Sequence, residues 1–177
     1  MIRVGEAMTR ILEEAGIPVI HDTTLNDYPS YNGSYDRTRE NIERYLEQYP
    51  SIQMVIDVHR DAIESPAGNL IKPVAMIDGE KTAQVMIIAG CDDGTMNMPD
   101  WERNLRWAAA LQSTAETMYP GLTRPVFFCY RKYNMDLTGG SLLIEFGSHG
   151  NTLEETARAA EYMGKAMAQT LLDTLPQ

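Results

Sequence analysis

The chain has 177 residues, 44% of them hydrophobic, a length that suits one domain with a sizeable core spanning residues 1–177. Its formal net charge of -10 argues against a nucleic-acid surface and against attraction to an anionic membrane. No apolar run approaches the roughly 18 residues that span a bilayer, and no basic stretch precedes an apolar one at the N-terminus, so no signal peptide is visible.

The first part of the chain is predicted to be a helix followed by a short strand. Apolar residues recur at helical spacing over residues 4–15, and Gly16 is expected to end this helix. Residues 17–20 are a predicted strand that ends in His21 and Asp22. A parallel α/β domain normally has a strand ahead of its first helix. Either the fold starts with this helix, or an upstream strand is absent from the sequence.

A polar loop over residues 23–34 leads to a second predicted helix at 36–48, which Pro50 ends. Tyr28, Tyr31 and Tyr35 in this region could line a binding cleft, or they could pack the loop down on itself.

The next predicted strand, residues 53–59, is apolar until it meets His59 and Arg60. Such a run is typical of a strand buried on both faces, and ligands of open α/β sheets bind beyond the carboxyl ends of strands. His59 is therefore a candidate site residue, although a histidine at a strand end is more often a hydrogen-bonded structural residue.

The remaining elements complete a predicted α/β fold, with a mostly parallel twisted sheet, helices on both faces and one hairpin excursion. Residues 73–77 and 84–89 flank Asp78 and Gly79, which indicates the hairpin. A helix is expected at 100–118, strands at 125–130 and 141–145, and a last helix from about 152 to 174. Asn151 is its expected N-cap, with Glu154 three residues later as in a capping box.

Glu145 closes the last predicted strand, where an ionised carboxylate is costly to bury without a partner. It could form a salt bridge with Arg60 or Arg131, or it could act as a general base. Together with His59 it suggests a metal-assisted hydrolase, in which zinc needs three protein ligands and an open position. The chain has three histidines, His21, His59 and His149, and no H-E-x-x-H motif, so the residues alone do not assemble a zinc site.

Several longer runs match a known family in order and spacing. They are VIHD at residues 19–22, YPSYNG at 28–33, VIDVHRDA at 55–62 and LIEFGSHGNT at 143–152. Over nearly its whole length the chain resembles the stage II sporulation protein P family.

The resemblance implies a zinc-dependent N-acetylmuramoyl-L-alanine amidase that degrades peptidoglycan during endospore engulfment and can also cleave peptide cross-links. It implies an extracytoplasmic, membrane-anchored protein that works with a lytic transglycosylase partner. It matches His59 to a zinc ligand and Glu145 to the catalytic base of the wider amidase fold. Arg60 lies in the same matched motif, and we assign it to substrate binding.

The family also has a zinc-ligand histidine, followed by a glutamate, in a His-x-His motif on a strand before the first helix. That motif and the membrane anchor are not in this sequence, so we expect an N-terminally truncated domain with weak zinc binding and little activity. His21 is expected to line the cleft or serve a structural role. His149 is expected either to contact substrate or to bond backbone in its turn. The alternative functions are a non-catalytic peptidoglycan- or protein-binding remnant and an unrelated deacylase.

Overall fold

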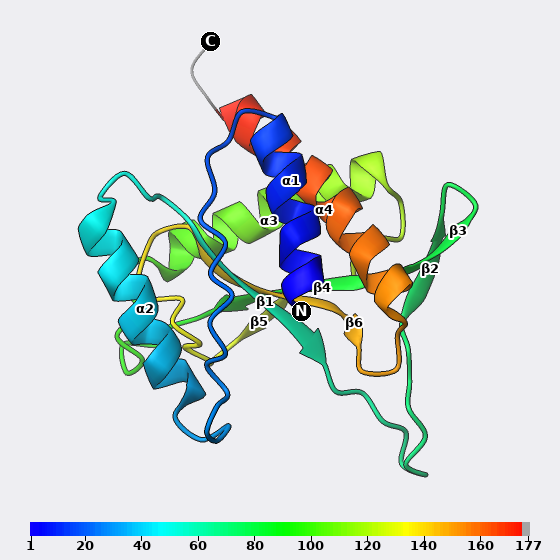
Figure 1. The fold of residues 1–177 in the computed structure, drawn as a ribbon, viewed down its shortest axis with the longest axis horizontal. Helices are drawn as coiled ribbons and strands as arrows, with labels where there is room; N and C mark the ends of the chain where they lie inside the picture. The colour runs from blue at the N-terminus through cyan, green and yellow to red at the C-terminus, as the bar shows by residue number, and fades with distance from the viewer. Residues whose placement is uncertain (175–177) are drawn as a thin grey trace.

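A four-stranded sheet, a separate hairpin and four helices make up the computed structural model, which describes residues 1–174 (Figure 1). The helices are α1 (Ile2–Glu14), α2 (Ser34–Gln48), α3 (Trp101–Met118) and α4 (Leu153–Thr174). The strands are β1 (Val55–Asp61), β2 (Val74–Ile77), β3 (Glu80–Ala83), β4 (Val85–Gly90), β5 (Phe127–Cys129) and β6 (Ser141–Ser148).

The main sheet has the strand order β1-β6-β4-β5. β1 is parallel to β6 and β5 is parallel to β4, whereas β4 and β6 are antiparallel. This arrangement confirms the predicted α/β class with a mostly parallel sheet.

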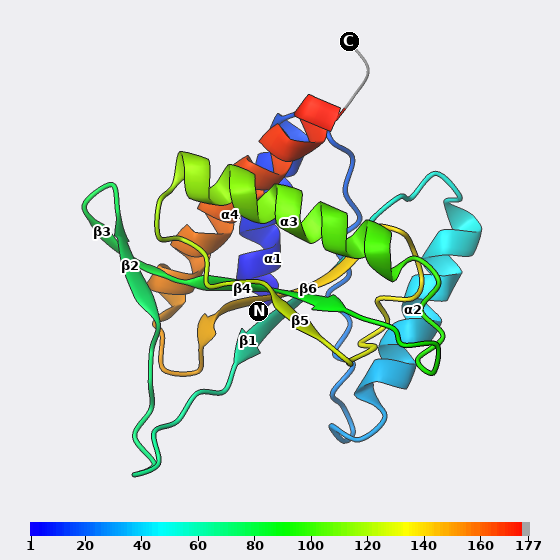
Figure 2. The same cartoon turned by 180° about the vertical axis from the view of Figure 1, so that it is seen from behind.

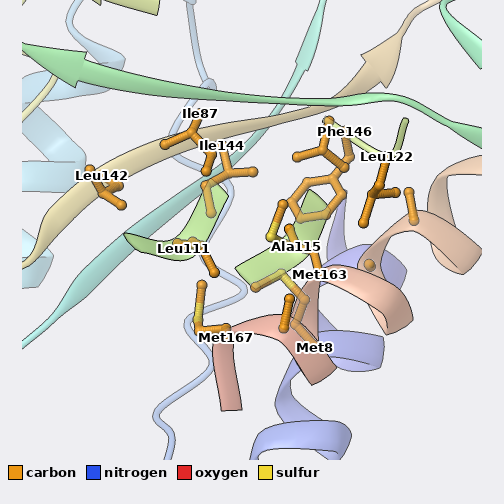
Figure 3. Close-up of a cluster of buried hydrophobic side chains, with 14 of the residues drawn as sticks. Met8, Ile87, Leu111, Ala115, Leu122, Leu142, Ile144, Phe146, Met163 and Met167 are labelled. Atoms are coloured by element: carbon orange, nitrogen blue, oxygen red, sulfur yellow. The ribbon is translucent and has the colours of Figure 1, made fainter. Parts of the chain in front are cut away.

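The core lies on one face of this sheet, beneath α1, α3 and α4 (Figure 2). Along β6, Leu142, Ile144 and Phe146 point into it, because alternate residues of a strand face opposite sides. Figure 3 shows these side chains meeting apolar residues from all three helices. The labelled members of this cluster are Met8, Ile87, Leu111, Ala115, Leu122, Leu142, Ile144, Phe146, Met163 and Met167.

The opposite face of the sheet carries a smaller apolar cluster that includes Ile88 and Leu143. Tyr35 of α2 stacks on His59 of β1, and Arg39 of α2 pairs with Asp136. On this face α2 meets the edge strand β1, and none of the residues of α2 is buried.

The predicted strand at residues 17–20 is wrong, because this segment is extended but belongs to neither sheet. Its sequence pattern reflects burial, not strand pairing. Ile17 and Val19 pack against the core, whereas Pro18 and Ile20 are exposed. Alternating burial is what a strand shows, and an extended segment lying along a core shows the same period.

The hairpin is present, but its second strand is β3 at Glu80–Ala83 and not the predicted 84–89. Asp78 and Gly79 both have positive φ, 52° and 80°, which is the conformation of a two-residue type I′ turn. That turn sets Ile77 opposite Glu80. The run from Val85 onward is a separate strand, β4, which pairs within the main sheet.

The cap of the last helix also differs from the prediction by one residue. The Thr152 hydroxyl accepts a hydrogen bond from the Glu155 N–H (3.2 Å), and the Glu155 carboxylate accepts one from the Thr152 N–H (3.0 Å). This reciprocal pair is a capping box with Thr152 as N-cap. Asn151 instead accepts from the Ser148 N–H and donates to the Pro73 carbonyl, so it joins the turn before α4 to the start of β2.

Candidate functional site

His59 and Glu145 lie side by side on neighbouring parallel strands. The register of β1 and β6 pairs His59 directly with Glu145, and both residues face away from the main core. Neither residue ends its strand as predicted, because β1 continues to Asp61 and β6 continues to Ser148. The structure therefore brings together the two residues that carry the predicted chemistry.

Both strands are irregular just beyond this pair. The register of β1 and β6 shifts between His59 and Asp61, and Gly147 of β6 has a φ of +66°. A Cβ atom at Gly147 would lie 2.6 Å from the Asn151 side-chain oxygen, so both the backbone conformation and the close packing require glycine. The irregularity brings Ser148 opposite Asp61, at the open end of the strand pair.

Glu145 has the electrostatic character of a proton acceptor near neutral pH. Burial raises its pKa to about 7, with further upward contributions from Asp61 and Asp57, while His59 and Arg124 oppose the shift. Its Oε2 atom is buried and has no hydrogen-bond partner among the described residues. A carboxyl group with this pKa and a free oxygen suits general acid–base chemistry.

His59 is held on two sides. Its Nε2 atom lies 3.0 Å from Asp57 Oδ1, two residues earlier on the same strand. The Tyr35 ring stacks on the imidazole with centroids 6.1 Å apart and planes 9° apart. Burial alone would lower the pKa of His59, but the hydrogen bond and charge of Asp57, helped by Glu145, raise it above its ordinary value. Burial also raises the pKa of Tyr35.

Arg124 is a residue of the site that the sequence analysis missed. Its Nη1 atom lies 3.0 Å from Asp61 Oδ2, and its charge acts on Glu145. Its Nε and Nη2 atoms are buried and have no partner among the described residues. Arg124 precedes the three-residue strand β5, far from the matched motifs, so no local pattern marks it.

The alternative ion pairs expected for Glu145 are not formed. Within residues 1–174, Glu145 makes no ion pair with Arg60, Arg131 or any other basic residue. Arg60 is exposed at the point where β1 loses its register with β6. Its predicted role in substrate binding stays a prediction.

His21 and His149 occupy different places. The ring of His21 lies against α1, where a Cβ atom at Gly5 would come within 2.4 Å of its Nε2, so it packs on the helix layer over the core. The His149 N–H donates to the Asp61 carbonyl (2.8 Å), and its Nε2 lies 3.6 Å from a Glu64 carboxylate oxygen. Its Nδ1 is buried and unpartnered among the described residues. His149 is thus beside the open end of the strand pair, whereas His21 is not part of it.

The described residues do not form a complete metal site. Residues 1–174 contain no group of three or more His, Cys, Asp or Glu side chains placed to hold a metal ion. The imidazole of His59 can serve as one zinc ligand. The Glu145 oxygen that has no partner among the described residues could accept a proton next to it. The side chains present therefore fit one ligand position and not a full set.

An open groove of about 430 Å³ lies between α2 and the segment that precedes β6. Tyr35, whose ring stacks on His59, forms part of its wall, as the sequence suggested. Tyr28 and Tyr31 are 76% and 69% exposed and do not line it. The lining residues are Tyr35, Asp36, Arg39, Lys132, Tyr133 and Asn134.

The fold is the one found in N-acetylmuramoyl-L-alanine amidases of known structure. The CwlD amidase of Clostridioides difficile, solved in complex with the GerS lipoprotein, matches with a TM-score of 0.61 and 13% identity over 97% of this chain and 82% of that one. The amidase AmiC2 of Nostoc punctiforme matches with a TM-score of 0.54 and 12% identity over 97% of this chain and 80% of that one. At these identities the similarity defines the class of fold.

The sequence then identifies the family. The stage II sporulation protein P (SpoIIP) family model matches residues 1–168, and the chain belongs to this family. The stage II sporulation protein P of Bacillus subtilis (strain 168) is 30% identical over 181 residues, covering 96% of this chain and 43% of the relative. The chain thus spans less than half the length of that relative. Over residues 1–174, none of the helices combines the length and apolar character that crossing a bilayer requires.

Proposed function

We propose that this chain hydrolyses the amide between N-acetylmuramic acid and L-alanine in peptidoglycan, as part of endospore engulfment. The observation that carries the proposal is the carboxyl group of Glu145 beside the imidazole of His59. The two lie in register on adjacent strands, and Glu145 has a pKa of about 7 and a buried oxygen without a partner among residues 1–174. Membership of the SpoIIP family supports the assignment.

Glu145 would act as the general base and then as the general acid. At neutral pH a carboxyl group with a pKa of about 7 is present in both protonation states. It can therefore accept a proton from the attacking water and pass it to the departing amine nitrogen. Glu145 lies on β6, between β1, which carries His59, and β4.

Zinc is the proposed cofactor, and His59 is the ligand that we assign to this chain. A bound zinc ion would polarise the substrate carbonyl and lower the pKa of the attacking water. Asp57 lies within hydrogen-bonding distance of the His59 ring, and a carboxylate in such a place commonly orients a metal-binding histidine. The family resemblance assigns the further ligands to a His-x-His motif that these 177 residues do not contain.

The family resemblance also supports a setting for this activity. We propose an extracytoplasmic protein that is membrane-anchored in its full-length form and that acts on the cell wall together with a lytic transglycosylase. A pull-down from sporulating cells, probed for a transglycosylase, tests the partner.

The test is the release of peptides with a free N-terminal L-alanine from purified peptidoglycan, followed by mass spectrometry at high zinc concentration. We expect slow release by the chain and none by Glu145→Gln or His59→Ala. Glu80→Gln is the matched control, because Glu80 lies on the β2–β3 hairpin and is exposed. Retention on the cell wall without release would favour the binding remnant, and cleavage of a different amide would favour a deacylase.

A further inference from the structure

The β2–β3 hairpin has an open edge. It forms a two-stranded sheet of its own, so β2 has β3 on one side and, among residues 1–174, no strand on the other. Figures 1 and 2 show the hairpin projecting from the rest of the molecule, beside α4. Another strand can add to an unpaired strand edge, and for this reason proteins usually protect such edges.

The backbone groups on this open edge are those of Val74 and Met76. Ile77 and Glu80 flank the two-residue turn and exchange hydrogen bonds, so every second residue of β2 before Ile77 also faces β3. The Pro73 carbonyl follows this alternation, because it accepts a hydrogen bond from the residue after β3 (3.1 Å). No other backbone group among the described residues bonds Val74 or Met76, so their N–H and C=O groups point outward.

The side chains of β2 that reach solvent are apolar. Val74 is 39% exposed and Met76 is 61% exposed, whereas Ala75 packs against the core and Ile77 is buried. β2 itself carries no charged residue, and charged side chains are a common means of blocking a strand edge. Pro73 leaves the edge open, because its carbonyl faces β3. The edge is therefore both unpaired and unprotected.

The sequence of this edge is complementary to itself. In an antiparallel pair of two copies centred on Ala75, Val74 of each copy lies opposite Met76 of the other. These are the residues with outward backbone groups, so both pairs can exchange hydrogen bonds. In the same register Lys72 lies opposite Asp78 of the second copy, at both ends of the strand. Each of these charged side chains already has one partner in its own chain, so the opposite charges favour the register and add little strength.

We propose that this edge is a self-association surface, on which two copies of the chain pair their β2 strands antiparallel about a two-fold axis. The product is one four-stranded sheet with the strand order β3-β2-β2-β3. A two-fold interface has to be complementary to itself, and the register centred on Ala75 meets this condition. The dimer is weak, because two paired four-residue strands bury less than the roughly 1,200 Å² of a stable interface. The association does not depend on the proposed hydrolysis, since neither His59 nor Glu145 belongs to the hairpin.

The experiment is sedimentation velocity of the 177-residue chain over a concentration series. We expect a monomer at low concentration and a weight-average mass that rises toward twice that of one chain at high concentration. Met76→Lys puts a charge on the open edge and removes both apolar cross-strand pairs, so it should weaken the association about tenfold. Met118→Lys is the matched control, because Met118 is an exposed methionine at the end of α3 and the substitution changes the net charge equally.

Cysteine cross-linking tests the register. Under mild oxidation, Val74→Cys chains mixed with Met76→Cys chains should give a covalent dimer, whereas neither variant should do so alone. Cross-linking that is equally efficient in the unmixed variants would overturn the proposal. So would a chain that stays monomeric throughout the series, a Met76→Lys variant that associates as the unmodified chain does, or an equal loss of association in Met118→Lys.

Discussion

Replacing Glu145 with glutamine is expected to stabilise the protein at alkaline pH and to leave its stability nearly unchanged at acidic pH. Burial raises the pKa of Glu145 from 4.5 to about 7, so the folded state holds this proton more tightly than the unfolded state does. Between these two pKa values the wild-type protein loses stability as pH rises, because the folded state must release a proton that it binds strongly. Glutamine cannot ionise and escapes this loss.

The size of the effect follows from the pKa shift. At about 1.4 kcal/mol per pKa unit the shift corresponds to roughly 3 kcal/mol. Glu145 is only partly buried, so solvent screening leaves about 1–2 kcal/mol. For a chain of this length that is a rise of about 2–8 °C in Tm.

Urea unfolding at pH 4.0 and pH 8.5, followed by circular dichroism, measures the effect. The difference in stability between Glu145→Gln and the wild type should appear at pH 8.5 and almost vanish at pH 4.0, below the pKa of 4.5 that the carboxyl group has in the unfolded chain. The exposed Glu80→Gln variant should show no such pH dependence. An equal change at both pH values, or a less stable Glu145→Gln at pH 8.5, would refute the reasoning.

Three further predictions test other parts of the molecule. Isothermal titration should show only weak zinc binding by the 177-residue chain, and His59→Ala should weaken the binding further. Tight one-to-one binding would contradict the incomplete set of metal ligands in residues 1–174. Asn104→Ala should lower the free energy of unfolding by about 2–3 kcal/mol, because the buried Asn104 side chain donates to the Met135 carbonyl and accepts from the Ser141 N–H. Urea unfolding measures this loss, and a loss below about 0.5 kcal/mol would be inconsistent with the two hydrogen bonds. Thr152→Ala should cost about 1 kcal/mol by removing the N-cap of α4, measured as the shift in Tm, and an unchanged Tm would argue against the capping box.

The main helices and strands could be predicted from the sequence because each of them leaves a local pattern of apolar and polar residues. The helical spacing of apolar residues predicted all four helices to within a few residues, and the apolar run before His59 predicted β1. The strand predicted at residues 17–20 was wrong because alternating apolar residues indicate which side chains are buried. They do not indicate whether a neighbouring strand is available for pairing. The second strand of the hairpin was predicted in the wrong place, because Asp78 and Gly79 indicate a turn but not which residues after the turn form the strand.

The site was predictable in part. His59 and Glu145 each interrupt an apolar strand, and a polar residue in such a place stands out in the sequence. Arg124 did not stand out, because it joins the site only through tertiary structure, by reaching Asp61 from the segment before β5. The stacking of Tyr35 on His59 likewise depends on how α2 lies over the sheet. Contacts between distant segments leave no periodic trace in the chain.

The position of Glu145 on β6 would tie the proposed catalysis to the packing of the interior. Ile144 and Phe146, on either side of Glu145, are fully buried in the main core, so the backbone of Glu145 lies between two packed side chains. Heat or a poorly fitting interior substitution would displace the proton acceptor in the same event that loosens the packing. Loss of turnover and loss of structure should therefore follow one temperature curve, without an inactive but still folded interval between them.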